Sequence, residues 1–308
     1  MQLAKELFGK GIILNPNMVT QSQFSQIQFQ AVVENVSMFY KVLKGINFVD
    51  SAMVQLSKEG IKLTLEDAKC VQVVALVKSA CFSEYNLSAY PSAVAATGND
   101  GDESEPFASF GLNLKVFTDC LSMFTSSDFD PSLKIMRKGP GTPLVAILEG
   151  HREDNLITEC AVRTMEPFDC MDLDFDDDHP IVSKIAAKAS ELFLLLGELD
   201  DEDVIEVIIS PTAPHFRLKA LGDPEMETEI EIKKTSDIFI SFACSEASSN
   251  RYKLNHFKHV MRTLSLATKV VLSTNTEGLL GFQVIIETME DSLYYVQYFI
   301  LPLVLDSD

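Results

Sequence analysis

A short acidic run is the part of the sequence whose residue types could perform catalysis. Asp174, Asp176, Asp177 and Asp178 precede His179, and clustered carboxylates can hold Mg²⁺ in the manner of a nuclease site. Consecutive carboxylates on a loop are not preorganised, however, and no second cluster is evident that would complete a site. A 3'-5' DNA exonuclease with an acidic metal site is therefore the alternative function, and we expect no catalytic residue and no enzyme activity.

The histidines, cysteines and glycines do not form a metal or cofactor motif. His256 and His259 are three residues apart on an expected helix, where a surface or DNA-facing role is favoured over metal binding. The Gly9-Lys10-Gly11 run lacks the full phosphate-loop pattern, and none of the six cysteines forms a CxxC pair. We expect no metal, no cofactor and a reducing compartment.

The overall charge limits how the chain could meet nucleic acid. The formal net charge is −20 and the pI is about 4.6, whereas a protein that holds DNA with its whole surface would be basic. Any DNA contact must therefore be a local basic patch. No stretch approaches the ~20 apolar residues that span a bilayer, so no membrane association is expected.

An internal repeat organises the chain. Four segments share apolar residues with the spacing i, i+3, i+6, i+7, i+10, which is typical of one face of a helix. The stripes are Val36, Phe39, Val42, Leu43 and Ile46; Leu114, Phe117, Cys120, Leu121 and Phe124; Ala189, Leu192, Leu195, Leu196 and Leu199; and Leu254, Phe257, Val260, Met261 and Leu264. The first and third lie 153 residues apart and the second and fourth 140. The difference predicts an insertion in the first half, for which the Gly-, Pro- and acid-rich segment 89–106 is the candidate.

Short β-branched and aromatic segments lie between the predicted helices, with turn signals at Glu59-Gly60 and Glu277-Gly278. Two such halves predict an α+β fold, each half with two helices packed on an antiparallel sheet. The predicted units are an N-terminal extension, 1–21; a first domain, 22–164; a connector, 165–178; and a second domain, 179–305.

Positive charge is concentrated in the helical windows 32–44, 111–124, 181–196 and 251–264. They hold nine basic and three acidic residues, against the balance of the whole chain. If the four helices line one face, their outer sides form a basic wall that attracts phosphates without reading bases. The predicted DNA-facing residues are Lys41, Lys44, Lys115, Lys184, Lys188, Arg251, Lys258 and Arg262.

Several stretches resemble the Rad-one subunit of the heterotrimeric DNA-damage checkpoint clamp, called nine-one-one, within the PCNA superfamily. The most specific is Lys58-Glu-Gly-Ile-Lys-Leu-Thr-Leu-Glu-Asp-Ala-Lys-Cys-Val-Gln72. Shorter ones are Asp119-Cys-Leu-Ser-Met-Phe124, Leu173-Asp-Phe175, Pro214-His-Phe-Arg-Leu218 and Asn250-Arg-Tyr-Lys253. The similarity extends over roughly residues 22–303.

The resemblance implies a non-catalytic subunit of a nuclear ring that encircles double-stranded DNA without sequence specificity. Its partners would be two other clamp-like subunits, an ATP-dependent clamp loader, and checkpoint and repair proteins. Client peptides would dock beneath the connector at Leu173, Phe175, Pro302 and Leu303. A homotrimeric replication clamp is a further alternative, and a monomeric purified chain would argue against it.

Overall fold

The structure is a computed structural model that describes residues 27–33, 35–88, 107–125, 132–149, 157–199, 203–221, 228–288 and 293–304. The predicted extension 1–21 and insertion 89–106 lie outside the described residues. No helix among the described residues is long and apolar enough to cross a bilayer.

Among the described residues, the first half contains the helices α3 (Val36–Ile46) and α4 (Leu114–Thr125), ten strands and one 3-10 turn, η1 (Ser79–Cys81). The strands are β1 (Phe29–Val33), β2 (Ser51–Ser57), β3 (Gly60–Asp67), β4 (Val71–Lys78), β5 (Glu84–Leu87), β6 (Ala108–Asn113), β7 (Ser132–Arg137), β8 (Leu144–Glu149), β9 (Ile157–Val162) and β10 (Thr164–Met165). Asparagine side chains cap both helices: Asn35 Oδ1 accepts from the Met38 amide at 3.0 Å, and Asn113 Oδ1 from the Val116 amide at 2.9 Å.

The second half contains α5 (Ala189–Gly197) and α6 (Leu254–Leu264) among nine strands. The strands are β11 (Ile181–Lys188), β12 (Val204–Ile209), β13 (Phe216–Leu221), β14 (Thr228–Ile232), β15 (Phe239–Cys244), β16 (Ser248–Lys253), β17 (Lys269–Asn275), β18 (Leu280–Glu287) and β19 (Leu293–Ile300).

The sheets show that the two halves are copies of one fold. The first half forms a five-stranded sheet, β5-β1-β7-β8-β9, and the second repeats it as β15-β11-β17-β18-β19. The order β6-β2-β3-β4 likewise recurs as β14-β13-β12-β16 read in reverse. Antiparallel pairing of β4 with β19 then joins the halves into one ten-stranded sheet that begins at β10. The predicted duplicated α+β fold is confirmed.

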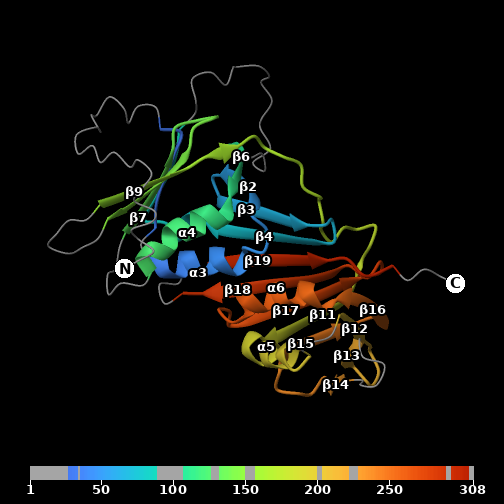
Figure 1. Cartoon of the computed structure of the whole chain (residues 1–308). Coiled ribbons are helices and arrows are strands. Elements are labelled where there is room, and N and C mark those ends of the chain that lie inside the picture. The colour runs from blue at the N-terminus through green and yellow to red at the C-terminus, as the bar shows by residue number, and fades with distance from the viewer. Residues whose placement is uncertain are drawn as a thin grey trace.

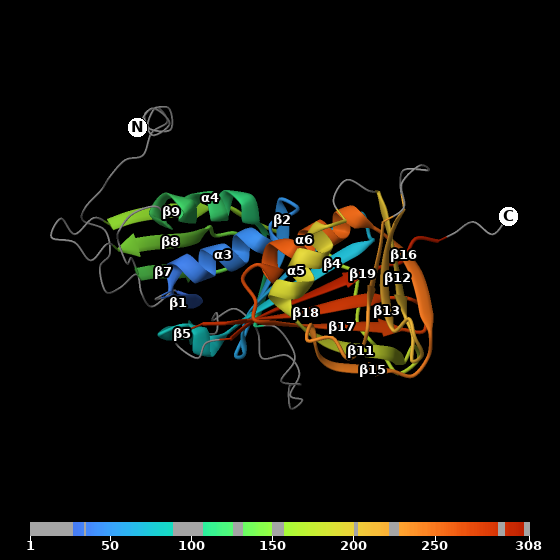
Figure 2. The ribbon, with the colours of Figure 1, turned by 90° about the horizontal axis from the view of Figure 1, so that it is seen from below.

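The four helices of the described residues gather on one side of the molecule (Figures 1 and 2). α3 contacts both α4 and α6, and α6 contacts α5, so the helices follow one another in the order α4, α3, α6, α5. The apolar stripe of each helix is buried toward the sheets, as its period predicts, in the described side chains such as Phe39, Leu121, Leu196 and Phe257. The outer helix faces are left for solvent or a ligand.

The starts of two predicted helices are wrong. The window 32–44 includes the last two residues of β1, and the window 181–196 includes all of β11. The segment Ile185-Ala-Ala-Lys188 has helix-compatible residues, but pairing with β15 and β17 holds it as a strand. Both predicted hairpins are present, with Gly60 at φ +147° and Gly278 at φ +80° in backbone conformations that favour glycine.

Candidate DNA-facing surface and connector pocket

The two central helices, α3 and α6, meet closely at the junction of the two halves. A Cβ on Gly45 would lie 2.8 Å from Thr263 Cγ2, so only glycine permits this approach. Phe48 stacks on His259 with ring centroids 4.5 Å apart, and Arg262 donates a hydrogen bond to the Asn47 carbonyl at 3.3 Å. The two helices therefore form a continuous surface across the junction.

This central surface is cationic. Lys41 and Lys44 of α3, and Lys258 and Arg262 of α6, are exposed, and neither helix contains an acidic residue. Lys44 Nζ lies 5.5 Å from the centroid of the Tyr40 ring. Four cations on two touching helices form a stripe that could follow a phosphate backbone.

Lys184 and Lys188 lie on strand β11, so their predicted helical position is wrong. Ile185 pairs with Leu272 on the buried face of the sheet, and adjacent residues of a strand point to opposite faces. Lys184, paired with Ser273, therefore lies on the face away from the helices. Lys188 is exposed at the N-terminal end of α5.

Arg251 is also on a strand, β16, and its Nε lies 3.6 Å from Glu206 Oε1. Lys115 is exposed on α4, but Asp119 is exposed on the same helix. With the helix bounds of the structure, the four helices hold five basic residues and two acidic ones. The cationic surface is thus smaller than the sequence predicted, and it is centred on α3 and α6.

His256 and His259 are not on the surface, contrary to the sequence-based expectation. They are only 6% and 8% exposed, and His259 stacks on Phe48, which follows α3 in the chain. Burial lowers the pKa of both histidines, that of His259 to about 4, and neighbouring Lys253 and Arg262 act in the same direction. Both are therefore neutral near pH 7 and add no charge to the surface.

The connector is held on the sheet by its own residues. The Met171 amide donates to Glu66 Oε2 at 2.7 Å, and Gln72 Nε2 donates to the Met171 carbonyl. Phe175 packs on Phe299 with centroids 5.7 Å apart. The Phe175 ring occupies the place of a side chain at Gly281, where a Cβ would be 2.6 Å from its Cε2 atom.

A cleft of about 500 Å³ lies between the connector and the sheet. Of the four predicted peptide-pocket residues, only Leu173 lines it, together with residues such as Met53, Val74 and Phe299. Phe175 anchors the connector instead, and Pro302 and Leu303 follow β19, where the Leu303 amide donates to the Arg251 carbonyl at 2.7 Å. The sheet residues that line the cleft could not be predicted from the sequence, because they come from separate strands that only the fold brings together.

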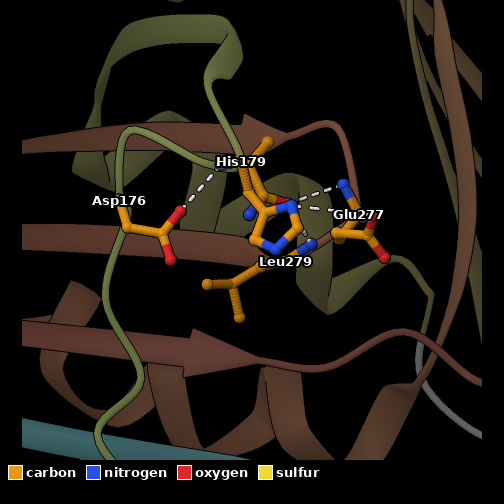
Figure 3. A network of polar contacts seen from close by, with 5 residues as sticks. Asp176, His179, Glu277 and Leu279 are labelled. Carbon is orange, nitrogen blue, oxygen red and sulfur yellow. Dashed lines mark hydrogen bonds and ion pairs between the residues drawn. The ribbon is translucent and has the colours of Figure 1, made fainter.

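The acidic run forms the C-terminal end of the connector (Figure 3). Asp176 Oδ1 accepts the His179 amide at 2.7 Å, and His179 Nδ1 lies 3.7 Å from Glu277 Oε1 in the β17–β18 turn. Asp174 Oδ1 accepts the Phe175 amide at 2.8 Å. In the part of the chain that the structure describes, no three His, Cys, Asp or Glu residues group as metal ligands. The carboxylates with defined partners organise the loop.

Two cysteines meet where α4 packs on the edge strand β9. A hydrogen bond between the Cys120 and Cys160 thiols lowers the pKa of Cys160 to about 7 and raises that of Cys120. Burial raises the pKa of Cys170 and of Cys244. Cys160 is therefore the thiol, of these four, that ionises most readily.

Comparison with known proteins matches residues 28–286 to a family described as "Repair protein Rad1/Rec1/Rad17". The chain is 30% identical to a DNA repair protein Rad1 of Drosophila melanogaster, over 92% of this chain and 97% of that protein. It is 31% identical to a human cell cycle checkpoint protein RAD1, over 92% and 94%. It is 24% identical to a DNA damage checkpoint control protein of Schizosaccharomyces pombe, over 91% and 88%.

Proposed function

Because this chain belongs to the Rad1/Rec1/Rad17 repair-protein family, which has the PCNA-like clamp fold, we propose that it is a non-catalytic subunit of a heterotrimeric DNA clamp. The ring encircles DNA at damage sites in the nucleus and is a platform for checkpoint and repair proteins. Its clamp domains are 22–164 and 179–305, joined by the connector 165–178.

One observation carries the ring proposal: the two strands that join the halves each have an equivalent strand in the other half, and both equivalents are edge strands. The joint pairs β4 with β19. In the duplicated fold, β14 corresponds to β4 and β9 corresponds to β19. Within the described residues, β9 and β14 are each paired on one side only. The same joint can therefore be formed between chains, which covers edges that would otherwise invite aggregation.

Exposed apolar side chains lie at both outer ends of the molecule. Ile157 on β9 is 59% exposed, Met123 on α4 52% and Leu194 on α5 62%. Isolated exposed apolar residues need no explanation, but these belong to the elements that the ring joint would bring together. Their positions support assembly through the two ends.

The cations of α3 and α6 lie at the centre of each chain and support the DNA-facing assignment of Lys41, Lys44, Lys258 and Arg262. The four cations form a stripe along α3 and α6, which fits contact with phosphates and not with base edges in the major groove. The cleft beneath the connector supports the platform role, since it is a concave site on the face away from the helices.

The proposal is tested by reconstitution with two other clamp-like subunits. The chain alone is expected to be monomeric by light scattering and to form a 1:1:1 complex with the two partners. An ATP-dependent loader should place that complex on nicked circular DNA, and linearising the circle should release it. A stable homotrimer, or binding that survives linearisation, would contradict the proposal.

A further inference from the structure

The joint inside the chain gives the residue register of a joint between chains. On the buried face of the intrachain joint, Tyr298 of β19 is opposite Val73 of β4. On the outward face, Gln297 is opposite Val74, so this position pairs two uncharged side chains. The Gln297–Val74 position of the joint therefore carries no charge on either strand.

The duplication transfers this register to β9 and β14. Val54 of β2 pairs with Leu63 of β3, and the counterpart of Val54, Val207 of β12, pairs with Leu218 of β13. Leu63 pairs with Ala75, and Leu218 pairs with Ile230. Ile230 is thus the equivalent of Ala75, Glu229 is that of Val74, and Thr228 is that of Val73.

The other edge follows in the same way. Leu280 is the first residue of β18 and pairs with Ile300, while Leu144 is the first residue of β8 and pairs with Val162. Two and three residues before Ile300 lie Tyr298 and Gln297, whose equivalents are Cys160 and Glu159.

A second copy of this chain placed on β9 would meet a like charge. Its Glu229 would lie directly opposite Glu159, and like charges in directly opposed strand positions destabilise the pairing. Both carboxylates are exposed. Arg217 bonds Glu229 at 3.0 Å but also Glu231 at 3.4 Å, so one guanidinium serves two carboxylates. Glu231 would lie opposite Ile157, on a diagonal from Glu159.

The helix contact gives an independent second mismatch. At the internal joint the missing side chain of Gly45 makes room for Thr263. The equivalent residues are Glu198, at the end of α5, and Met123 of α4, both exposed. A second copy would bring a glutamate side chain against Met123 and toward Asp119 of the same helix, where the internal joint has a glycine.

We infer that the β9–α4 face, formed by Glu159, Cys160, Asp119 and Met123, selects a different clamp chain by charge and excludes a copy of its own. The inference rests on the proposed ring. The neighbour that fits carries lysine or arginine opposite Glu159, an apolar residue opposite Cys160, and a small uncharged residue against Met123.

Charge reversal of the full-length chain tests the inference by sedimentation velocity. Glu159→Lys and Glu229→Lys should each self-associate, with affinity raised about fivefold per joint relative to the unaltered chain, the size of one strong cross-strand charge pair. The double variant opposes two lysines and should return to monomer. Glu84→Lys on β5, an edge strand outside the joint, makes the same change in net charge and should remain monomeric.

A disulfide reports the register directly. Thr228→Cys in the Glu159→Lys background should form a covalent dimer through Cys160 of the neighbouring copy, and Cys160→Ala should abolish it. Association of the double variant or of Glu84→Lys equal to that of Glu159→Lys would overturn the inference, as would single variants no more associated than the unaltered chain. If the partner-subunit complex still forms in that case, the ring proposal stands and only the charge selection fails; if no such complex forms, the proposed function fails by itself.

Discussion

The position of the lysines relative to the sheet predicts which of them determine the salt dependence of DNA affinity. Lys41, Lys44 and Lys258 lie on the helices of the central stripe, whereas Lys62, Lys78 and Lys184 are exposed on the opposite face of the ten-stranded sheet. Replacing either set with glutamine removes the same charge from the chain. Arg262 is left unchanged because it also bonds the Asn47 carbonyl and holds the α3–α6 junction.

The magnitude follows from counterion release. Each phosphate neutralised on duplex DNA contributes about −0.9 to the slope of log K against log salt, so three lost contacts reduce the slope by up to about 2.7. Between 50 and 200 mM salt, the unaltered clamp should therefore lose about 40-fold more affinity than the helix variant.

The assay is fluorescence anisotropy of labelled duplex DNA titrated with the assembled clamp at several salt concentrations. The sheet-face variant should keep the original slope, although its net charge equals that of the helix variant. Equal reductions in both variants would show a general charge effect, and an unchanged slope in the helix variant would refute the assignment of the stripe to DNA.

Two further predictions concern the core and the edge strand. The Tyr298 hydroxyl lies 3.0 Å from Thr263 Oγ1 and donates to the His259 carbonyl at 3.3 Å, so Tyr298→Phe should lower the free energy of unfolding in urea by about 1–2 kcal/mol. Tyr295→Phe is the matched control and should change it by less than about 0.5 kcal/mol; equal effects would contradict the role of the hydrogen bond. Cys160 should be alkylated by iodoacetamide with a midpoint near pH 7, because the thiolate is the reactive form. Cys120→Ala should move that midpoint upward, and peptide mass spectrometry that finds no movement would exclude the Cys120 hydrogen bond as its cause.

The helices could be predicted from sequence because their signal is local. Val36, Phe39, Val42, Leu43 and Ile46 report one buried face, and the same spacing recurs in the other three helices. The duplication was equally visible, since the four apolar stripes recur in the same order with related shifts. The shift that relates α3 to α5 does not extend to β13, because strand pairing places Leu218 at the position of Leu63. The Glu59-Gly60 and Glu277-Gly278 turns needed only the backbone freedom of glycine.

The positions of the site residues depended on strand pairing, which is not a local property. Nothing near Lys184 distinguishes a helix from a strand, and only its pairing with Ser273 shows that it points away from the helices. Phe175 was predicted to line a pocket, but the bare backbone of Gly281, more than a hundred residues away, gives its ring a packing site. The burial of His259 likewise depends on Phe48, which follows α3 in the other half.

The duplicated halves differ in the residues on their outer helix faces. The central helices have the residues suited to DNA contact, and the outer helices have those suited to recognition of a neighbouring chain. Lys41 of α3 corresponds to Leu194 of α5, and His259 of α6 corresponds to Asp119 of α4. The central pair α3 and α6 keeps exposed cations, and its junction is already closed within the chain. The outer pair α4 and α5 has no cation at the positions that correspond to these, although Lys115 is exposed on α4, and it carries exposed apolar and acidic residues where a neighbour must be recognised. A cation at Leu194 would add to phosphate attraction, but it would also offer Asp119 of a second copy an opposite charge. The smaller positive charge of the outer helices is thus the expected consequence of excluding self-assembly while keeping the DNA contact at the centre of the chain.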